Sequence, residues 1–170
     1  MKRARPPLAT KLRRGRLRDL DALMAIEDAV FTTDNLSRRG FRHFLTARSA
    51  TLMVAEEGGN LAGYVLVRYS SRNTIARVYS IAVNPKFRRQ GIGGRLLAAA
   101  ERDAKRRRCG AIRLEIHEHN PRSIAFHEKS GYSPFGRHSN YYDDGGDALR
   151  FEKPLGGEAR SRRRVRHKSA

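Results

Sequence analysis

A loop rich in arginine and glycine lies between an apolar run and a helical pattern near the middle of the chain. Its sequence is Arg88-Arg89-Gln90-Gly91-Ile92-Gly93-Gly94. Backbone N–H groups at the start of a helix have no partner within the helix and carry the positive end of its dipole. Glycine lets an anion approach that backbone closely, and arginine adds positive charge. The loop therefore favours a phosphate or pyrophosphate ligand.

A simpler interpretation of the same loop stays open. The glycines could serve only to make a tight turn, with the arginines on a solvated surface. The loop is not a Walker loop, because no Gly-Lys-Ser or Gly-Lys-Thr follows it, and the third glycine spacing of the dinucleotide pattern is missing. What favours a phosphate site is the context, since a strand, a turn and a helix follow one another here.

Glu115 is the second candidate for chemistry. It lies in the run Ala111–Ile116, where apolar residues alternate with polar ones. A charge on such a strand has a cost unless it is used or paired. Two interpretations follow: Glu115 acts as a general base, or it forms a structural ion pair with Arg113 or another basic residue.

His117 and His119 stand two residues apart, a spacing that could bind a metal at the end of a strand. No third ligand follows by spacing, so we expect no metal site. Cys109 is the single cysteine of the chain, which excludes an internal disulfide and suits a reducing cytoplasm. We expect it to be structural.

The length of 170 residues is enough for one domain with its own core. No apolar stretch is long enough to span a membrane, and no secretory signal peptide is visible near Met1. These features predict a cytoplasmic protein that does not enter a membrane.

The formal charge of +19 is concentrated at the two ends. Residues 1–18 hold eight Lys and Arg and no acid, and residues 156–170 hold six with one Glu. We expect a basic tail over residues 1–9, a folded domain over 10–155 and a disordered basic tail over 156–170, because like charges repel and little there can be buried. The tails could contact nucleic acid or a ribosome-like surface, or could simply be solvated.

Hydrophobic periodicity predicts alternating strands and helices in one α/β domain. Asn120-Pro121 suits a helix start and Gly131 a helix end. The expected helices run over Asp19–Phe31, after a Ser37 cap, from Gly91 to about Arg108 and from Asn120 to Gly131. The expected strands are residues 10–14, Leu52–Ala55, Leu61–Tyr69, Thr74–Val83, Ala111–Ile116, Tyr132–Tyr141 and Ala148–Lys153.

The motif Arg88-x-x-Gly91-x-Gly93 after Ile81-Ala82-Val83 resembles the acetyl-CoA pyrophosphate motif of the GNAT superfamily of N-acetyltransferases. Leu114-Glu115-Ile116, Asn120, Gly131-Tyr132 and Asn140-Tyr141-Tyr142 also fit. The resemblance covers roughly residues 10–154 and looks most like the ribosomal-protein alanine N-acetyltransferase branch. It implies the GNAT fold, of class α/β (α+β), with a mixed central sheet of about six to seven strands and about four helices.

The resemblance also implies roles for particular residues. Glu115 would be the general base, and Tyr141 and Tyr142 would hold the acceptor, although tyrosines at a strand end could equally serve core or edge packing. Asn120 would contact the coenzyme. The coenzyme set would be Ile81, Ala82, Val83, Arg88, Arg89, Gln90, Gly91, Ile92, Gly93, Gly94 and Asn120, with backbone groups of Ile81 and Val83 serving the pantetheine arm and the acetyl carbonyl.

His127 departs from the pattern, because the related branch has tyrosine there as general acid to the departing thiolate. A histidine can donate a proton, with an ordinary pKa near 6.5. It could therefore replace the tyrosine, or it could be a surface histidine facing Glu128. Leaving-group protonation could equally come from solvent or from a nearby tyrosine.

The sequence thus predicts an acetyl-CoA-dependent N-acetyltransferase that needs no metal. We expect direct attack by a primary amine in a ternary complex, with a protein or peptide N-terminus or a lysine as acceptor, or a small amine. The alternative is a catalytically inactive binding module for coenzyme A or other anions, suggested by His127 and the positive charge. A nucleic-acid binder that uses the tails is a further alternative, which no known nucleic-acid-binding motif supports.

Overall fold

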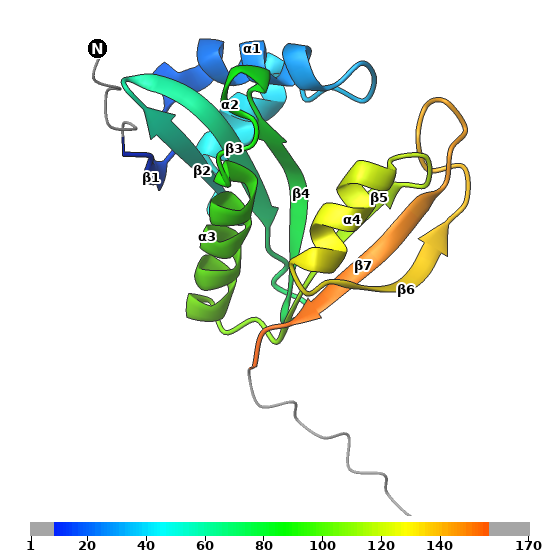
Figure 1. Cartoon of the computed structure of the whole chain (residues 1–170). Helices are drawn as coiled ribbons and strands as arrows, with labels where there is room; N and C mark the ends of the chain where they lie inside the picture. The colour runs from blue at the N-terminus through cyan, green and yellow to red at the C-terminus, as the bar shows by residue number, and fades with distance from the viewer. Residues whose placement is uncertain (1–8, 157–170) are drawn as a thin grey trace, which may run out of the picture.

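The computed structural model describes residues 9–156, and one seven-stranded sheet runs through the whole of that region (Figure 1). The tails predicted for residues 1–9 and 156–170 lie almost entirely outside the described residues. The strand order is β1-β2-β3-β4-β5-β7-β6. The strands are β1 (Lys11–Arg14), β2 (Ala50–Glu57), β3 (Asn60–Arg68), β4 (Ile75–Val83), β5 (Ala111–His117), β6 (Ser133–His138) and β7 (Ala148–Pro154).

Helices cover both faces of the sheet. The helices are α1 (Leu20–Val30), α2 (Arg38–Thr46), α3 (Ile92–Arg106) and α4 (Pro121–Lys129), with short 3₁₀ turns at Leu17–Asp19 and Pro85–Phe87. Two apolar cores result. One joins α3 and α4 to one face of the sheet, and the other joins α1 and α2 to the opposite face of β2, β3 and β4. No helix within residues 9–156 is long and apolar enough to cross a membrane.

The second core contains a buried polar network. Glu27 of α1 is 2% exposed, and its carboxylate accepts hydrogen bonds from the backbone N–H of Leu36 and from the hydroxyl of Tyr64. The Tyr64 hydroxyl also lies 2.8 Å from Ser80 Oγ on β4. Buried polar groups are tolerated when they are paired in this way. The network therefore ties the segment between α1 and α2 to the middle of the sheet.

β4 and β5 form the parallel pair of the sheet, and their pairing is short. Only Ile75, Ala76 and Arg77 pair with Ala111, Ile112 and Arg113. Beyond these pairs the two strands diverge toward their carboxyl ends (Figure 1). The connection between them is α3, which makes a β-α-β unit. In open sheets of this kind, ligands bind beyond the carboxyl ends of parallel strands, next to such a divergence.

The predicted order of strands and helices is confirmed, while several boundaries are corrected. The last helix begins after Asn120, and its C-cap is Ser130, so Gly131 (φ 94°) is the C′ residue as expected. The strand expected over Tyr132–Tyr141 is shorter, because Tyr132 is buried with its hydroxyl on Glu101 and the extended pairing ends at His138. Tyr141 therefore lies in a loop and not on a strand.

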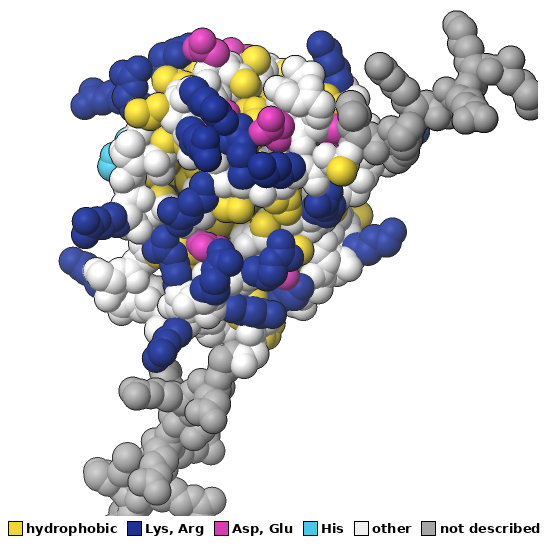
Figure 2. All heavy atoms as spheres, turned by 90° about the vertical axis from the view of Figure 1, so that its left-hand side faces the viewer, with side chains coloured by type: hydrophobic (Ala, Val, Ile, Leu, Met, Phe, Trp, Pro, Cys, Tyr) yellow, Lys and Arg dark blue, Asp and Glu magenta, His cyan; other side chains and the backbone are white. Residues whose placement is uncertain are grey.

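One face of the molecule is strongly basic. Figure 2 shows the side on which β1 and α3 lie, where Lys and Arg side chains cover much of the surface. Acidic side chains are sparse in this view. This distribution shows that part of the positive charge belongs to the folded domain and not to the tails.

Candidate active site

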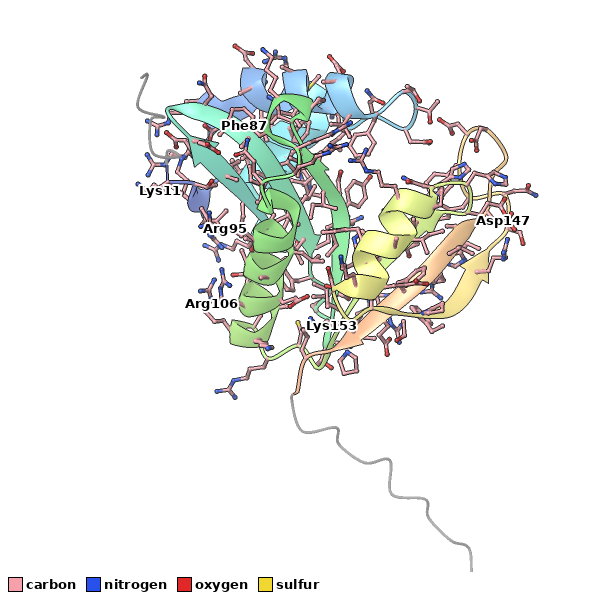
Figure 3. All side chains as sticks on the ribbon, in the orientation of Figure 1. Lys11, Phe87, Arg95, Arg106, Asp147 and Lys153 are labelled. Carbon is pink, nitrogen blue, oxygen red and sulfur yellow. The ribbon has the colours of Figure 1, made fainter. Side chains whose placement is uncertain are left out.

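The predicted phosphate loop forms the entry to α3, at the carboxyl end of β4. Gly91 is the N-cap in the left-handed region (φ 74°), and no side chain caps the helix. The first helical hydrogen bond runs from the N–H of Arg95 to the carbonyl of Gly91, at 3.1 Å. The N–H groups of Ile92, Gly93 and Gly94 therefore have no acceptor within the helix. Figure 3 shows Phe87 and Arg95 on either side of this loop.

Space and charge at this helix start suit an anion. A Cβ added at Gly91 or Gly94 would meet no other atom within 4 Å, so the approach to the backbone is open. Arg88, Arg89 and Gln90 are exposed, and Arg89 itself has positive φ (65°). Free N–H donors, open backbone and positive charge together match the requirements of a pyrophosphate group.

The edge of β4 supplies the next part of the site. Ile81, Ala82 and Val83 pair with β3 on one side. On the side facing β5, the strand pairing stops at Arg77. Alternate residues of a strand direct their N–H and C=O groups to opposite sides. Backbone groups between residues 78 and 83 are therefore directed toward the divergence, where an extended ligand could pair with them.

Asn120 lies at the carboxyl end of β5 and begins α4. Its side-chain oxygen accepts a hydrogen bond from the N–H of Ser123 at 3.1 Å, which confirms the predicted helix cap. Pro121 occupies the first helical position, where its missing N–H costs nothing. The cap accounts for the side-chain oxygen of Asn120 and leaves its amide N–H groups for another partner.

Glu115 lies on β5 on the face of the sheet that α1 and α2 share, since its neighbours Leu114 and Ile116 point into the opposite core. Its side chain is 10% exposed. Oε2 accepts a hydrogen bond from Nε of Arg77 at 3.0 Å, and Nε of Arg150 lies 3.9 Å from Oε1. The predicted partner Arg113 instead pairs with Glu152. Glu115 thus accepts a hydrogen bond from Arg77 on β4 and lies near the guanidinium of Arg150 on β7.

The tyrosines predicted to hold the acceptor lie close to this carboxylate. Nη2 of Arg77 donates to the hydroxyl of Tyr141 at 2.6 Å, so one arginine contacts both Glu115 and Tyr141. Tyr142 stacks on His117, with ring centroids 4.7 Å apart. Burial raises the pKa of Tyr142, so its phenol stays protonated and can donate a hydrogen bond.

Two loops that carry acidic residues approach each other beside the tyrosines. Asp34 follows α1, and Asp143 lies between β6 and β7. Asp34 raises the pKa of Asp143, first through a side-chain hydrogen bond and then through like charge. Asp144 accepts a hydrogen bond from the N–H of Gly146 and lies 2.8 Å from Nε2 of His117. Negative charge therefore gathers where these loops meet.

His127 lies within α4 and is almost fully buried, at 3% exposure. Nδ1 lies 2.8 Å from the carbonyl oxygen of Ser123, which can only accept, so Nδ1 carries the proton. Nε2 is buried without a partner among the described residues. Burial lowers the pKa of His127, so the ring is neutral near pH 7. The alternative of a surface histidine facing Glu128 is wrong.

Cys109 and the histidine pair have structural partners. Cys109 is buried and free, and burial raises the pKa of its thiol, as expected for a structural cysteine. The ring of His117 contacts the carboxylate of Asp144 through Nε2 and stacks on the ring of Tyr142. Within the described part of the chain, no group of three or more His, Cys, Asp or Glu side chains is arranged to hold a metal ion.

Sequence reasoning missed Arg77 and Arg150, which frame Glu115. Arg77 lies between two buried residues of β4 and Arg150 beside one of β7, a weak signal that many surface arginines share. It also missed the irregular register between β3 and β4, where Leu66 pairs with Ser80 and Val67 with Val78. This bulge at Tyr79 turns its ring toward Phe44 of α2, with ring centroids 5.5 Å apart.

Comparison with known proteins identifies the class. The acetyltransferase (GNAT) family matches residues 20–132. A protein of Bacillus subtilis (strain 168), provisionally named a ribosomal protein bS18-alanine N-acetyltransferase, is 31% identical over 81% of this chain and 91% of its own length. The N-alpha-acetyltransferase of Sulfurisphaera tokodaii is 30% identical over 85% of this chain and 93% of its own.

Solved structures agree in fold. The crystal structure of the ribosomal-protein-S18-alanine N-acetyltransferase from Escherichia coli has a TM-score of 0.78 at 24% identity, over 86% of this chain and 94% of that one. Ard1 from Thermoplasma volcanium gives 0.78 at 25% identity, over 86% and 98%. The chain belongs to the GNAT family of acetyltransferases, and it is an acetyl-CoA-dependent N-acetyltransferase.

The open space at Gly94 provides a test of the phosphate loop. Gly94→Val adds a side chain that meets no protein atom in its first position, so the fold should be kept. The new methyl groups would occupy the space through which a phosphate reaches the N–H groups of α3. We expect the affinity for acetyl-CoA to fall at least about tenfold in calorimetric titration.

Gly110→Val is the matched control, because Gly110 is also exposed and a Cβ added there also meets open space, at the far end of α3. ADP serves as the control for plain anion binding. Acetyl-CoA affinity that is the same in Gly94→Val as in the unmodified protein would place the coenzyme elsewhere.

The buried neutral ring of His127 should make stability depend on pH. Because burial lowers its pKa, the unfolded chain takes up a proton that the folded protein does not as pH falls below about 6.5. This group then reduces the free energy of unfolding by up to about 1.4 kcal/mol per pH unit until its own folded pKa is reached. Urea unfolding at pH 7.5 and 5.5 should show a smaller decrease for His127→Phe.

His119→Phe is the control, because the side chain of His119 is 79% exposed and its replacement leaves His127 in place. Equal decreases in the unmodified protein and in His127→Phe would assign the pH dependence to another group.

Proposed function

We propose that the acceptor is the amino group of a protein or peptide N-terminus, acetylated by direct attack in a ternary complex with acetyl-CoA. The relatives support this acceptor class, since their names describe acetylation of a ribosomal-protein alanine and of N-alpha amines. Within that class we favour ribosomal proteins. The proposal includes a cytoplasmic location, which suits the single free thiol.

The divergence of β4 from β5 is the observation that carries this proposal. At the carboxyl ends of these strands lie the start of α3, the start of α4 and the carboxylate of Glu115. In this proposal residues 88–94 hold the pyrophosphate, the edge of β4 at Ile81–Val83 binds the pantetheine arm, and Asn120 contacts the coenzyme. Acetyl-CoA supplies the activated thioester, and positioning provides much of the rate.

The acceptor amine would enter from the face of the sheet that carries α1 and α2. Tyr141 and Tyr142 lie there, and the carboxylates of Asp34, Asp143 and Asp144 lie in the loops beside them. Carboxylates attract an ammonium group, and neutral phenols can donate to peptide carbonyls. A peptide whose N-terminus lies between these loops would bring its amine toward Glu115.

Glu115 is proposed as the general base that removes the proton of the attacking amine, directly or through one water. Arg77 positions its carboxylate through a hydrogen bond, and the guanidinium of Arg150 adds positive charge 3.9 Å away. The amine nitrogen bonds to the acetyl carbon, the bond from that carbon to sulfur breaks, and the thiolate leaves. Backbone N–H groups at the edge of β4 are suited to stabilise the oxyanion.

The departing thiolate needs a proton, and His127 is proposed to supply it. Because the free protein keeps the ring neutral with its proton on Nδ1, Nε2 must first take up a proton from solvent before it can protonate the thiolate. Solvent or a nearby tyrosine is the alternative donor. A pH–rate profile that is unaltered in His127→Phe would exclude His127 from the proton transfer.

The role of Glu115 is tested by Glu115→Gln, which keeps the shape and one hydrogen-bond acceptor but cannot take up a proton. We expect turnover with an N-terminal peptide to fall by about 10²–10⁴ at saturating substrate, with acetyl-CoA affinity retained. Steady-state kinetics and calorimetry measure the two quantities.

Glu152→Gln is the matched control, because Glu152 also pairs with an arginine across neighbouring strands. Turnover that is unchanged in Glu115→Gln would remove Glu115 from the chemistry. Acetyl-CoA binding without turnover on any peptide, lysine or small amine would favour the inactive binding module instead.

A further inference from the structure

We propose that the face formed by β1, the outer side of α3 and the turn after α2 binds the phosphate backbone of double-stranded RNA. This basic face is defined by Lys11, Arg14, Arg48, Arg95, Arg102, Arg106 and Arg107. The choice of RNA rests on the proposed function, because a ribosomal protein that accepts the acetyl group would lie close to structured ribosomal RNA. The surface itself is argued from its geometry and charge.

Three arginines form a stripe along α3. Arg95, Arg102 and Arg106 are seven and four residues apart, so they lie on one side of the helix, over a length of about 16 Å. The opposite side of α3 is buried in the core through Leu96, Leu97 and Ala100 and neighbouring residues. The stripe therefore faces solvent along the whole helix.

β1 extends the stripe sideways. Nη2 of Arg95 donates to the carbonyl oxygen of Thr10 at 3.0 Å, which brings α3 next to the start of β1. Lys11 follows Thr10 and is exposed. Figure 3 shows Lys11, Arg95 and Arg106 along the same edge of the molecule, and Figure 2 shows that edge face-on as a field of basic side chains.

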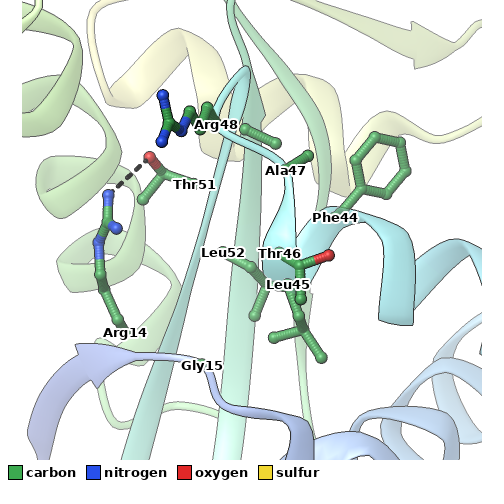
Figure 4. Close-up of a pocket in the computed structure, with 10 residues that line it drawn as sticks. Arg14, Gly15, Phe44, Leu45, Thr46, Ala47, Arg48, Thr51 and Leu52 are labelled. Carbon is green, nitrogen blue, oxygen red and sulfur yellow. Dashed lines mark hydrogen bonds between the residues drawn. The ribbon is translucent and has the colours of Figure 1, made fainter.

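A second group of arginines converges on one hydroxyl. Arg14 and Arg107 both donate to Oγ1 of Thr51, at 3.4 and 3.0 Å. Arg107 also donates to the carbonyl oxygen of Arg48 at 3.1 Å. Figure 4 shows the side chains of Arg14 and Arg48 on either side of Thr51, where they line a cavity of about 170 Å³. The guanidinium groups of Arg14 and Arg107 therefore meet at the start of β2.

Little of this charge is neutralised within the protein. Among residues 9–156, the ion pairs of the basic face are those of Arg106 and Arg107, both with the buried Asp103. Lys11, Arg14, Arg48, Arg95 and Arg102 have no ion pair in that part of the chain. Concentrated like charge destabilises a fold unless a counter-charge arrives. A polyanion supplies that counter-charge.

The chemistry of the face favours phosphate contacts over other anionic surfaces. A helix that binds a membrane needs a free apolar side, and the apolar side of α3 is in the core. Base stacking needs exposed aromatic rings. The ring of Tyr69 is covered by Arg107, whose guanidinium carbon lies 4.1 Å from the ring centroid, so it is not open to a base. B-form DNA carries one phosphate per about 3.4 Å of axis on each strand, so a stripe about 16 Å long is long enough to contact several phosphates of a nucleic-acid duplex.

RNA bound on this face would leave the acceptor site free. The basic face lies on the side of α3 away from α4, whereas Glu115 lies on β5, beyond β4. RNA would then act as a docking surface that raises the local concentration of N-termini that lie near it, without touching the reacting groups.

The test uses the full-length protein and a labelled RNA duplex of about 20 base pairs, with fluorescence anisotropy at several salt concentrations. The triple variant Lys11→Glu, Arg95→Glu, Arg102→Glu should bind at least about tenfold more weakly than the unmodified protein. The slope of log affinity against log salt should become shallower by about two to three.

The matched control is Arg39→Glu, Arg42→Glu, Arg72→Glu, which changes net charge equally at three exposed arginines outside the basic face. It should keep most of the affinity, and thermal unfolding verifies that both variants fold. Equal losses in the two variants would overturn the proposal, because net charge or the tails would then account for binding. Tighter binding to a DNA duplex or to phosphatidylserine vesicles through the same residues would overturn the choice of RNA.

Peptide acetylation, measured without RNA, separates this proposal from the proposed function. If N-terminal peptides are not acetylated while the face binds RNA as expected, the acceptor assignment fails and the RNA surface stands. If peptides are acetylated while the triple variant binds RNA normally, the RNA surface fails and the acceptor assignment stands.

Discussion

Parallel pairing holds β4 to β5 only from Ile75 to Arg77 on one strand and from Ala111 to Arg113 on the other. Beyond these pairs each strand has a side without a strand neighbour, and backbone N–H and C=O groups there need other partners. β4 then leads into α3, whose first N–H groups are also available, whereas β5 leads into α4, where Asn120 caps the N–H of Ser123. The short ladder therefore gathers unused backbone donors at one end of the sheet, and the candidate site is built around that end.

Arg77 connects this divergence to the acceptor side. It is the last residue of β4 that pairs with β5, and its guanidinium contacts both Glu115 and Tyr141. Tyr141 lies in the loop between β6 and β7, which approaches the segment after α1 through Asp143 and Asp34. The position of the carboxylate is thus linked to two loops, so acceptor binding in those loops can affect its alignment.

Hydrophobic periodicity and helix-capping residues predicted most of the fold, because the order of strands and helices depends on local sequence patterns. Asn120, Gly131 and Ser37 marked helix ends correctly. The candidate site was harder to predict, because Arg77 is 38 residues from Glu115 and 64 from Tyr141 in the sequence. The register of a parallel strand pair cannot be deduced from the spacing of residues along the chain. The buried, neutral state of His127 depends on the packing of α4 against the sheet and α3 through Ile124 and Phe126, which no local pattern gives.

The two parts of the sheet, β1 to β4 and β5 to β7, are joined by three residue pairs, the packing of α3 and the contacts of Arg77. A ligand that pairs with the edge of β4 and with the start of α3 would add contacts across this weak junction. Binding to the folded state alone raises stability with ligand concentration. The lifetime of the folded protein would then follow the supply of its acyl donor, so metabolism could set the amount of enzyme as well as its rate.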